Sequence, residues 1–203
     1  MADITHGTWI NNGKAVDKVF SDGRQVYGRN LLLDTGFNDL PTYWISYAGT
    51  VSGTFNGHNV IYYDATTITD GFREVLQQRI YDPSLTTNRV LPSSWYTLSF
   101  YAKGVGKLTT YVYPSFVEVS ANSYTDGVAL GRAHADGSTY WDLTDDWVRH
   151  TYTFKSRSSF STTDVQNVLF RAFKGNTVYI TMPKFEAGTT ATDYSLAPED
   201  ILN

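Results

Sequence analysis

The sequence predicts an all-β protein whose strands form a two-sheet antiparallel sandwich. Short segments rich in Tyr, Thr, Val and Phe recur along the whole chain, and Gly-containing turns separate them. Several of these segments alternate apolar and polar residues, which is typical of strands with one buried face. No segment shows the 3.6-residue apolar period of an amphipathic helix. With 203 residues, the chain is long enough for one sandwich but short for two full domains.

The first 28 residues read as a small meander. Candidate strands at 8–10, 15–20 and 25–27 are separated by Asn12-Gly13 and Asp22-Gly23, which are preferred dipeptides of tight hairpin turns. Such a meander is too small to hold a core by itself. We therefore expect residues 1–28 to form an N-terminal connector or small β element.

Residue 29 begins the main predicted domain, which extends to residue 196. Its ten candidate strands lie near 31–33, 43–47, 59–63, 72–81, 95–103, 107–113, 127–132, 147–155, 166–173 and 177–186. Ten short strands require two packed sheets. The last segment, 197–203, has the sequence of a C-terminal linker, and we expect the chain to be a domain of a longer protein.

Composition excludes several classes of function. The net charge is −4, so the chain has no general basic surface for a phosphate backbone, and we expect no nucleic-acid partner. There is no run of about twenty apolar residues, and we expect no membrane insertion. The absence of Cys removes disulfides and thiolate-bound zinc. Aromatic residues reach 15% while charged residues are only 18%. This composition indicates aromatic rings that pack in strands or form a binding face.

Catalytic and metal-binding motifs are missing. The four His are far apart, and neither a nucleophile elbow nor a glycine-rich phosphate loop occurs. A glycosidase needs two facing carboxylates, and spacing alone neither shows nor excludes such a pair among the four Glu. Asp142, Asp145 and Asp146 lack the spacing of a calcium loop, so an Asp-rich turn is the better interpretation. We expect no enzyme activity and no cofactor; a structural calcium elsewhere stays open.

Aromatic side chains are the candidate ligand-binding groups. Tyr111 and Tyr113 point to one side of the same predicted strand, and such a pair of rings could stack on a sugar, although a core position is an equally good interpretation. Trp44 and Trp141 lie in polar or Pro-containing surroundings, so we expect them to be exposed enough to act as platforms. Trp95 and Trp147 open apolar strands, and we assign these two rings to the core.

Planar polar side chains would bind the sugar hydroxyls beside these rings. Gln77 and Arg79 alternate with Leu76, Gln78 and Ile80, and Arg171 alternates with apolar neighbours on another strand. We expect Gln77, Arg79 and Arg171 to line one groove; the alternative is an ordinary polar sheet face.

Four stretches of the main domain carry a family resemblance: 30–33 with Gly36-Phe37, 95–104, 147–154 and 183–200. Together they resemble the jelly-roll carbohydrate-binding modules of tail and baseplate proteins, such as enlarged distal tail proteins, of siphophages that infect Gram-positive lactic acid bacteria. Residues 13–30 are similar to the connector that often precedes these modules. Some related jelly rolls hold a structural calcium, for which Asp34 and Glu186 would be the nearest oxygens here.

The resemblance implies a jelly roll that binds host cell-wall or surface polysaccharide as part of a virion tail or baseplate, acting at the host cell surface. No invariant sugar-binding residue is transferred by it. Two other functions stay open on the sequence. One is a structural spacer or protein-interaction domain of the tail, and the other is a cell-wall glycosidase.

Overall fold

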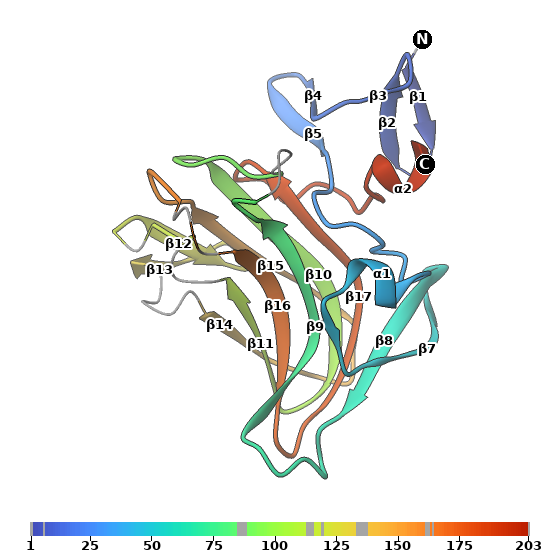
Figure 1. Cartoon of the computed structure of the whole chain (residues 1–203), viewed down its shortest axis with the longest axis vertical. Helices are drawn as coiled ribbons and strands as arrows, with labels where there is room; N and C mark the ends of the chain where they lie inside the picture. Colours follow the sequence, from blue (N-terminus) through green and yellow to red (C-terminus); the bar gives the residue numbers. More distant parts are fainter. Residues whose placement is uncertain are drawn as a thin grey trace.

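Two antiparallel sheets form the body of the protein in the computed structural model, which describes residues 2–5, 7–84, 89–112, 116–118, 120–132, 138–160, 163 and 165–202 (Figure 1). One sheet has seven strands in the order β13 (Val128–Arg132), β12 (Asn122–Thr125), β15 (Val148–Lys155), β10 (Trp95–Val105), β17 (Thr177–Ala187), β8 (His58–Asp64) and β7 (Thr50–Phe55). The other has five in the order β14 (Ser138–Asp142), β11 (Lys107–Val112), β16 (Gln166–Phe173), β9 (Phe72–Tyr81) and β6 (Ser46–Tyr47). The predicted all-β sandwich of the jelly-roll type is confirmed.

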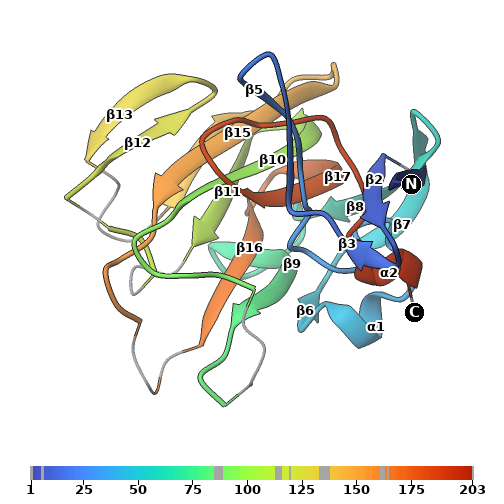
Figure 2. The ribbon, with the colours of Figure 1, turned by 90° about the horizontal axis from the view of Figure 1, so that it is seen from above.

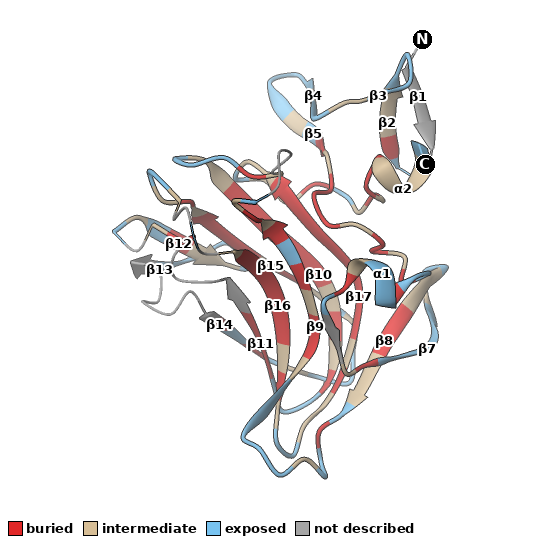
Figure 3. Cartoon of the chain, in the orientation of Figure 1, coloured by how far each residue is buried: buried red, intermediate tan, exposed pale blue. Residues whose placement is uncertain are grey.

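The core lies between the two sheets, where buried residues follow the middle of the long strands (Figure 3). Phe100 on β10 meets Phe170 on β16 edge to face, with ring centroids 5.0 Å apart, so the two inner faces interlock. Leu98, Phe100 and Ala102 all point inward, as their alternation with polar residues predicts. The other side chains of each strand therefore lie on the outer faces of the two sheets.

The N-terminal segment forms two small sheets beside the sandwich. β1 (Ala2–Thr5), β2 (Thr8–Asn11) and β3 (Lys14–Ala15) make one, and the hairpin of β4 (Lys18–Ser21) and β5 (Arg24–Gly28) makes the other. The chain end returns to this region as the short helix α2 (Glu199–Leu202), and Figure 2 shows both ends of the chain on the same side. Arg29 forms ion pairs with both Asp17 and Glu199. The division at residues 28 and 197 stays a prediction.

Asn30 joins distant segments at the start of the main domain. Its buried amide nitrogen donates to the carbonyl oxygens of Pro183 and Ser195 at 3.1 and 3.0 Å, and its oxygen accepts from the backbone of Leu32 and Phe185. This side chain satisfies backbone groups that a strand would pair with another strand. Residues 31–33, predicted as a strand, are consequently irregular.

Three other element predictions differ from the structure. The predicted strand at 43–47 starts instead in the short helix α1 (Leu40–Tyr43), where Pro41 occupies the first turn, which needs no backbone N–H donor. β7 and β12 were not predicted, because the Gly-containing sequence of β7 and the polar sequence of β12 resemble loops. Residues 138–142, which are not among the ten predicted strands, form the edge strand β14 paired with β11.

Candidate functional site

The outer face of the five-stranded sheet gathers side chains suited to binding a polar, flat ligand. Val168, Phe170 and Ala172 of β16 belong to the core, so Asn167, Leu169, Arg171 and Phe173 take the opposite face. On β9, Glu74, Gln77 and Arg79 stand opposite Arg171, Leu169 and Asn167 in the register. We call this set of positions the β9–β16 face; Thr109, Asn167 and Leu169 within it are buried. Its members are Phe72, Glu74, Gln77, Arg79, Thr109, Tyr140, Asn167, Leu169, Arg171 and Phe173.

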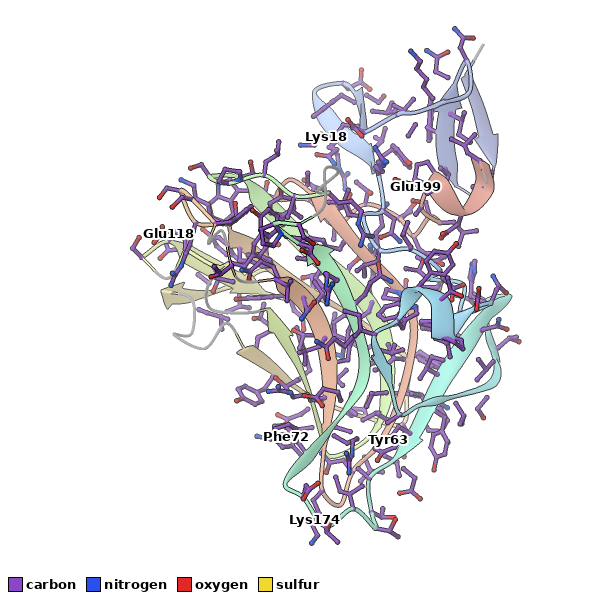
Figure 4. The ribbon with its side chains drawn as sticks, in the orientation of Figure 1. Lys18, Tyr63, Phe72, Glu118, Lys174 and Glu199 are labelled. Atoms are coloured by element: carbon purple, nitrogen blue, oxygen red, sulfur yellow. The ribbon has the colours of Figure 1, made fainter. Side chains whose placement is uncertain are left out.

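Arg171 is held flat at the centre of this face. Its Nη2 lies 3.2 Å from Oε1 of Glu74 across the two strands. Its guanidinium group lies over the ring of Phe72, 4.5 Å from the centroid. An ion pair and a cation–π contact together fix the plane of the guanidinium, which is a rigid fork of N–H donors. Phe72 is labelled at the lower end of the sheet in Figure 4.

Two stacked rings border a hollow on the same sheet face as Arg171. Tyr140 of β14 and Phe173 of β16 lie with ring centroids 6.0 Å apart and an interplanar angle of 22°. They line a hollow of about 420 Å³ together with Gly106, Lys107 and Asn176. Tyr140 is 47% exposed, so its ring is available for contact. Aromatic surface beside an amide, an ammonium and a guanidinium is the arrangement with which proteins bind sugar rings and hydroxyls.

The other end of the face is more polar. Arg79 is exposed and forms an ion pair with Asp82 at 2.7 Å, and it also lines a second hollow of about 440 Å³ with Tyr43, Tyr81 and Arg89. Asn167 is 4% exposed, and its side-chain oxygen has no hydrogen-bond partner within the described part of the chain. An unsatisfied buried acceptor is costly and suits a ligand donor.

The structure thus brings three of the predicted polar residues, Gln77, Arg79 and Arg171, to one face of adjacent strands. Tyr111 of β11 pairs with Leu169 and shares this face by register, although its side chain lies outside the described part of the structure. Tyr113 lies outside the described residues altogether. That these residues bind a ligand stays a prediction.

The expected exposure of Trp44 and Trp141 is wrong. Trp44 is 1% exposed, its ring packs against Phe37, and its Nε1 donates to the carbonyl of Asp34. Trp141 is 4% exposed because β14 pairs with β11, which turns this ring inward against Phe100. Neither indole offers a face to solvent. We therefore move the stacking role to Tyr140 and Phe173, which the sequence analysis did not name.

Trp95 and Trp147, assigned to the core, are instead partly exposed on the outer face of the seven-stranded sheet. Tyr96 and Leu98 point inward, so the alternation of β10 turns Trp95 outward. Trp147 stacks on Phe55 at 4.6 Å. The alternation of inward and outward residues along β10 already indicated that Trp95 faces outward, and this alternation should have outweighed the general preference of Trp for the interior.

Carboxylates do not gather into a pair on the β9–β16 face among the described Glu residues. Glu74 is bound by Arg171, and Glu118 accepts from Ser120. Glu186 accepts from Thr192, and Glu199 binds Arg29. Figure 4 labels Glu118 and Glu199 on opposite sides of the molecule. Hydrogen bonds from Ser120 hold the pKa of Glu118 below its usual value, which favours the ionised form over a general acid.

Asp34 and Glu186, the oxygens expected nearest to a structural calcium, belong to separate networks. Asp34 accepts from the backbone of Asn38 and Asp39, whereas Glu186 is completely buried and accepts from Thr192. Among the described residues, no group of three or more His, Asp or Glu has a metal-binding arrangement. In the same part of the chain, no helix has the length and apolar character needed to cross a membrane.

No family model matches the sequence, and no curated protein matches it. Solved structures do resemble the fold. One is a protein of Bacteroides thetaiotaomicron VPI-5482 described as a candidate sugar binding protein, with 16% identity, a TM-score of 0.51, and coverage of 79% of this chain and 100% of that one. Another is a family 16 carbohydrate binding module, with 12% identity, a TM-score of 0.50, and coverage of 77% and 99%.

A looser resemblance is to the tripod from the baseplate of bacteriophage Tuc2009, with 16% identity, a TM-score of 0.44, and coverage of 86% of this chain and 61% of that one. At these identities the first two likenesses establish a shared sandwich fold and nothing more. The fold thus defines a class of β-sandwich that includes carbohydrate-binding modules, and the site itself has to supply the function.

Proposed function

We propose that this chain is a non-catalytic carbohydrate-binding module whose ligand lies on the β9–β16 face. The observation that carries the proposal is the hollow lined by the stacked rings of Tyr140 and Phe173, with the fixed guanidinium of Arg171 on the same face of the sheet. The rings offer apolar surface to the C–H faces of a sugar, and Arg171 and Gln77 supply planar donors to its hydroxyls. Binding requires no covalent step.

The sequence resemblance supplies the biological setting of the proposal. The module would belong to a siphophage tail or baseplate protein, bind cell-wall polysaccharide of a Gram-positive host, and assist adsorption. A shallow site of this kind binds weakly one copy at a time, and repetition on a symmetric tail would raise its avidity.

The test is a fluorescent fusion of the full chain, incubated with a panel of lactobacilli and lactococci and competed with soluble sugars. We expect strain-selective labelling that a particular sugar abolishes. Tyr140→Ala and Arg171→Ala should each weaken labelling about tenfold or more, equivalent to ~1.4 kcal/mol. Phe20→Ala is the matched control, because Phe20 is an aromatic residue 59% exposed on the connector. Equal labelling by all variants would reject the β9–β16 face as the site.

A second candidate function, protein interaction within the tail, is favoured by one observation. Phe55, Tyr101 and Trp147 form a contiguous ring cluster on the outer face of the seven-stranded sheet, and the tilted rings of Tyr62 and Tyr179 contact each other with centroids 4.7 Å apart. Exposed aromatic surface of this kind is common at protein interfaces. Failure of the fusion to label any strain, even as a multivalent display, would favour this function.

A further inference from the structure

Another hollow lies on the opposite side of the sandwich from the β9–β16 face, over the outer face of the seven-stranded sheet. It measures about 640 Å³, larger than the hollow of the β9–β16 face and within the range of small-ligand sites. Its lining includes Trp95, Tyr124, Thr151, Thr153, Thr189 and Ala191. We call it the Trp95 hollow.

Two aromatic rings form its sides. Trp95 begins β10 and faces outward, and Tyr124 of β12 stands opposite Thr153 of β15 in the register. The ring centroids of Trp95 and Tyr124 are 6.4 Å apart with an angle of 46° between the planes. Because the rings are tilted, neither covers the face of the other, and both remain partly exposed.

The rim after β17 is held in place by hydrogen bonds at both of its ends. Gly188 donates its N–H to the carbonyl of Trp95 at 2.7 Å and accepts from the hydroxyl of Thr97 at 2.9 Å. Four residues later, the backbone and hydroxyl of Thr192 donate to the buried carboxylate of Glu186. Thr189 and Ala191 lie between these anchors and form one wall of the hollow.

The opposite wall is fixed through Asp126 in the turn between β12 and β13. Its carboxylate accepts from the backbone N–H of Thr151 at 2.6 Å and lies 3.0 Å from Nδ1 of His150. These contacts tie the hairpin that carries Tyr124 to the neighbouring strand β15. Figure 2 shows this hairpin extending beside β15. A site whose walls are already fixed loses little entropy when it binds.

A further hollow of about 500 Å³ adjoins the Trp95 hollow, since Trp95 and Thr189 line both. Gln25 and Lys18 of the connector hairpin line its far side. Trp95 therefore stands at the middle of a path that runs from the β12–β13 hairpin to the connector. A path of this length fits several linked sugar units better than a single one.

The chemistry of the lining identifies the class of ligand. None of the described residues that line the Trp95 hollow is charged, and threonine hydroxyls accompany the two rings. The nearby carboxylate of Asp126 is bound to Thr151 and His150, and Lys18 lines only the adjoining hollow. Rings provide apolar stacking surface, and hydroxyls exchange hydrogen bonds with neutral hydroxyl groups. We propose that the Trp95 hollow is a second binding site, independent of the β9–β16 face, which takes a neutral oligosaccharide chain stacked on Trp95 and Tyr124.

The test follows the indole N–H signals of the full chain by NMR, with the five Trp signals assigned from Trp→Phe variants. The probes are neutral hexasaccharides of glucose, galactose, N-acetylglucosamine or rhamnose, and the anionic comparison is hexagalacturonate. We expect at least one neutral probe to move the Trp95 signal in a saturable manner and hexagalacturonate to leave it unmoved. Tyr124→Ala and Ala191→Trp should weaken this response at least fivefold. Tyr62→Ala, an aromatic substitution on the same sheet but outside the hollow, should leave it unchanged.

The two sites are separated by variants of each. In Tyr140→Ala, the Trp95 response should persist, because the rings lie on opposite sheets. Binding that Tyr140→Ala removes while the Trp95 signal never moves would overturn the second site and leave the proposed function standing. A Trp95 response combined with cell labelling that neither Tyr140→Ala nor Arg171→Ala weakens would support the second site and reject the β9–β16 face. No response of the Trp95 signal to any neutral probe, or an equal response in Tyr124→Ala, would also overturn the second site.

Discussion

Buried charges hold the last stretch of chain onto the seven-stranded sheet. Lys184 is completely buried and donates from Nζ to the hydroxyl of Thr192 at 2.8 Å and to the carbonyl of Asp193 at 2.6 Å. Burial lowers the pKa of Lys184 to about 8 and raises that of Glu186, which lies 3.9 Å away. Lys184 and Glu186 act by positioning Thr192 rather than by attracting each other. Desolvation offsets much of the Coulomb energy of a buried pair.

Asp200, near the chain end, makes the stability of the folded protein depend on pH. Burial raises the pKa of Asp200 to about 6, and the carboxylates of Asp34 and Glu199 add to this shift. Because the folded-state pKa lies above the unfolded value, the stability from this group is complete at low pH and is lost as pH rises through 6. We expect Asp200→Asn to be more stable than the parent at pH 7 by ~1 kcal/mol.

Urea denaturation of both chains between pH 4 and 7 checks this expectation. The difference between them isolates Asp200 from Asp64 and Asp82, whose lowered pKa values change stability in the opposite direction. The backbone N–H of Asp34 donates to both oxygens of Asp200, and Asn keeps one of these two acceptors. A pH-independent difference would show that Asp200 titrates normally in the folded protein.

At the scale of elements, β10 organises the molecule. It pairs with β15 on one side and β17 on the other, and its inward residues fill the core. Its outward residues include Trp95, which lines the Trp95 hollow, and Tyr101, which belongs to the ring cluster with Phe55 and Trp147. One strand thus connects the core to both features of the outer face.

Gly104 tests how closely β10 and β17 must approach. Its φ is +143°, and an added Cβ would stand 2.0 Å from the backbone carbonyl oxygen of Thr177. We expect Gly104→Ala to lower the free energy of unfolding by about 3 kcal/mol or more, since backbone would have to move. Gly57→Ala is the control, because its φ is +79° but a Cβ there meets nothing within 4 Å. That control should cost only about 1 kcal/mol in denaturant unfolding; equal losses would show that only backbone strain matters.

At the scale of the whole molecule, the chain ends and the hollow of Tyr140 and Phe173 occupy different regions. Both ends lie beside the small N-terminal sheets, while the labelled residues Phe72 and Lys174 lie at the other end of the sandwich (Figures 1 and 4). A module held through its terminal regions would present this hollow away from the point of attachment. Such an arrangement suits display in many copies.

Multivalent display should therefore change apparent affinity strongly. We expect a tetrameric fusion to bind labelled cells at least about a hundredfold more tightly than the monomeric fusion, because each further contact is intramolecular. The measurement is the apparent Kd of both formats by cell-binding titration on the same strain, with a tetrameric Tyr140→Ala fusion as control. Equal apparent Kd values in the two formats would contradict cooperative binding to a repeated surface saccharide.

The sequence by itself determined the sandwich, most of its long strands, and the placement of Gln77, Arg79 and Arg171 on solvent-facing positions. These predictions depend on alternation along a single strand, which is a local property. The irregular 31–33 segment was missed because its backbone N–H groups donate to distant partners, the carbonyl of Phe185 and the side-chain oxygen of Gln78. The edge strand β14 was missed because its pairing partner, β11, is distant in sequence.

Only the tertiary structure decided which rings are available to a ligand. Trp44 and Trp141 are buried by Phe37 and Phe100, which no local pattern reveals, whereas Tyr140 and Phe173 come together from strands separated by β11. The Trp95 hollow likewise needs β10, the β12–β13 hairpin and the segment after β17 in one place. The physical reason is that strand alternation fixes the direction of a side chain, while its exposure depends on which distant segments pack against it.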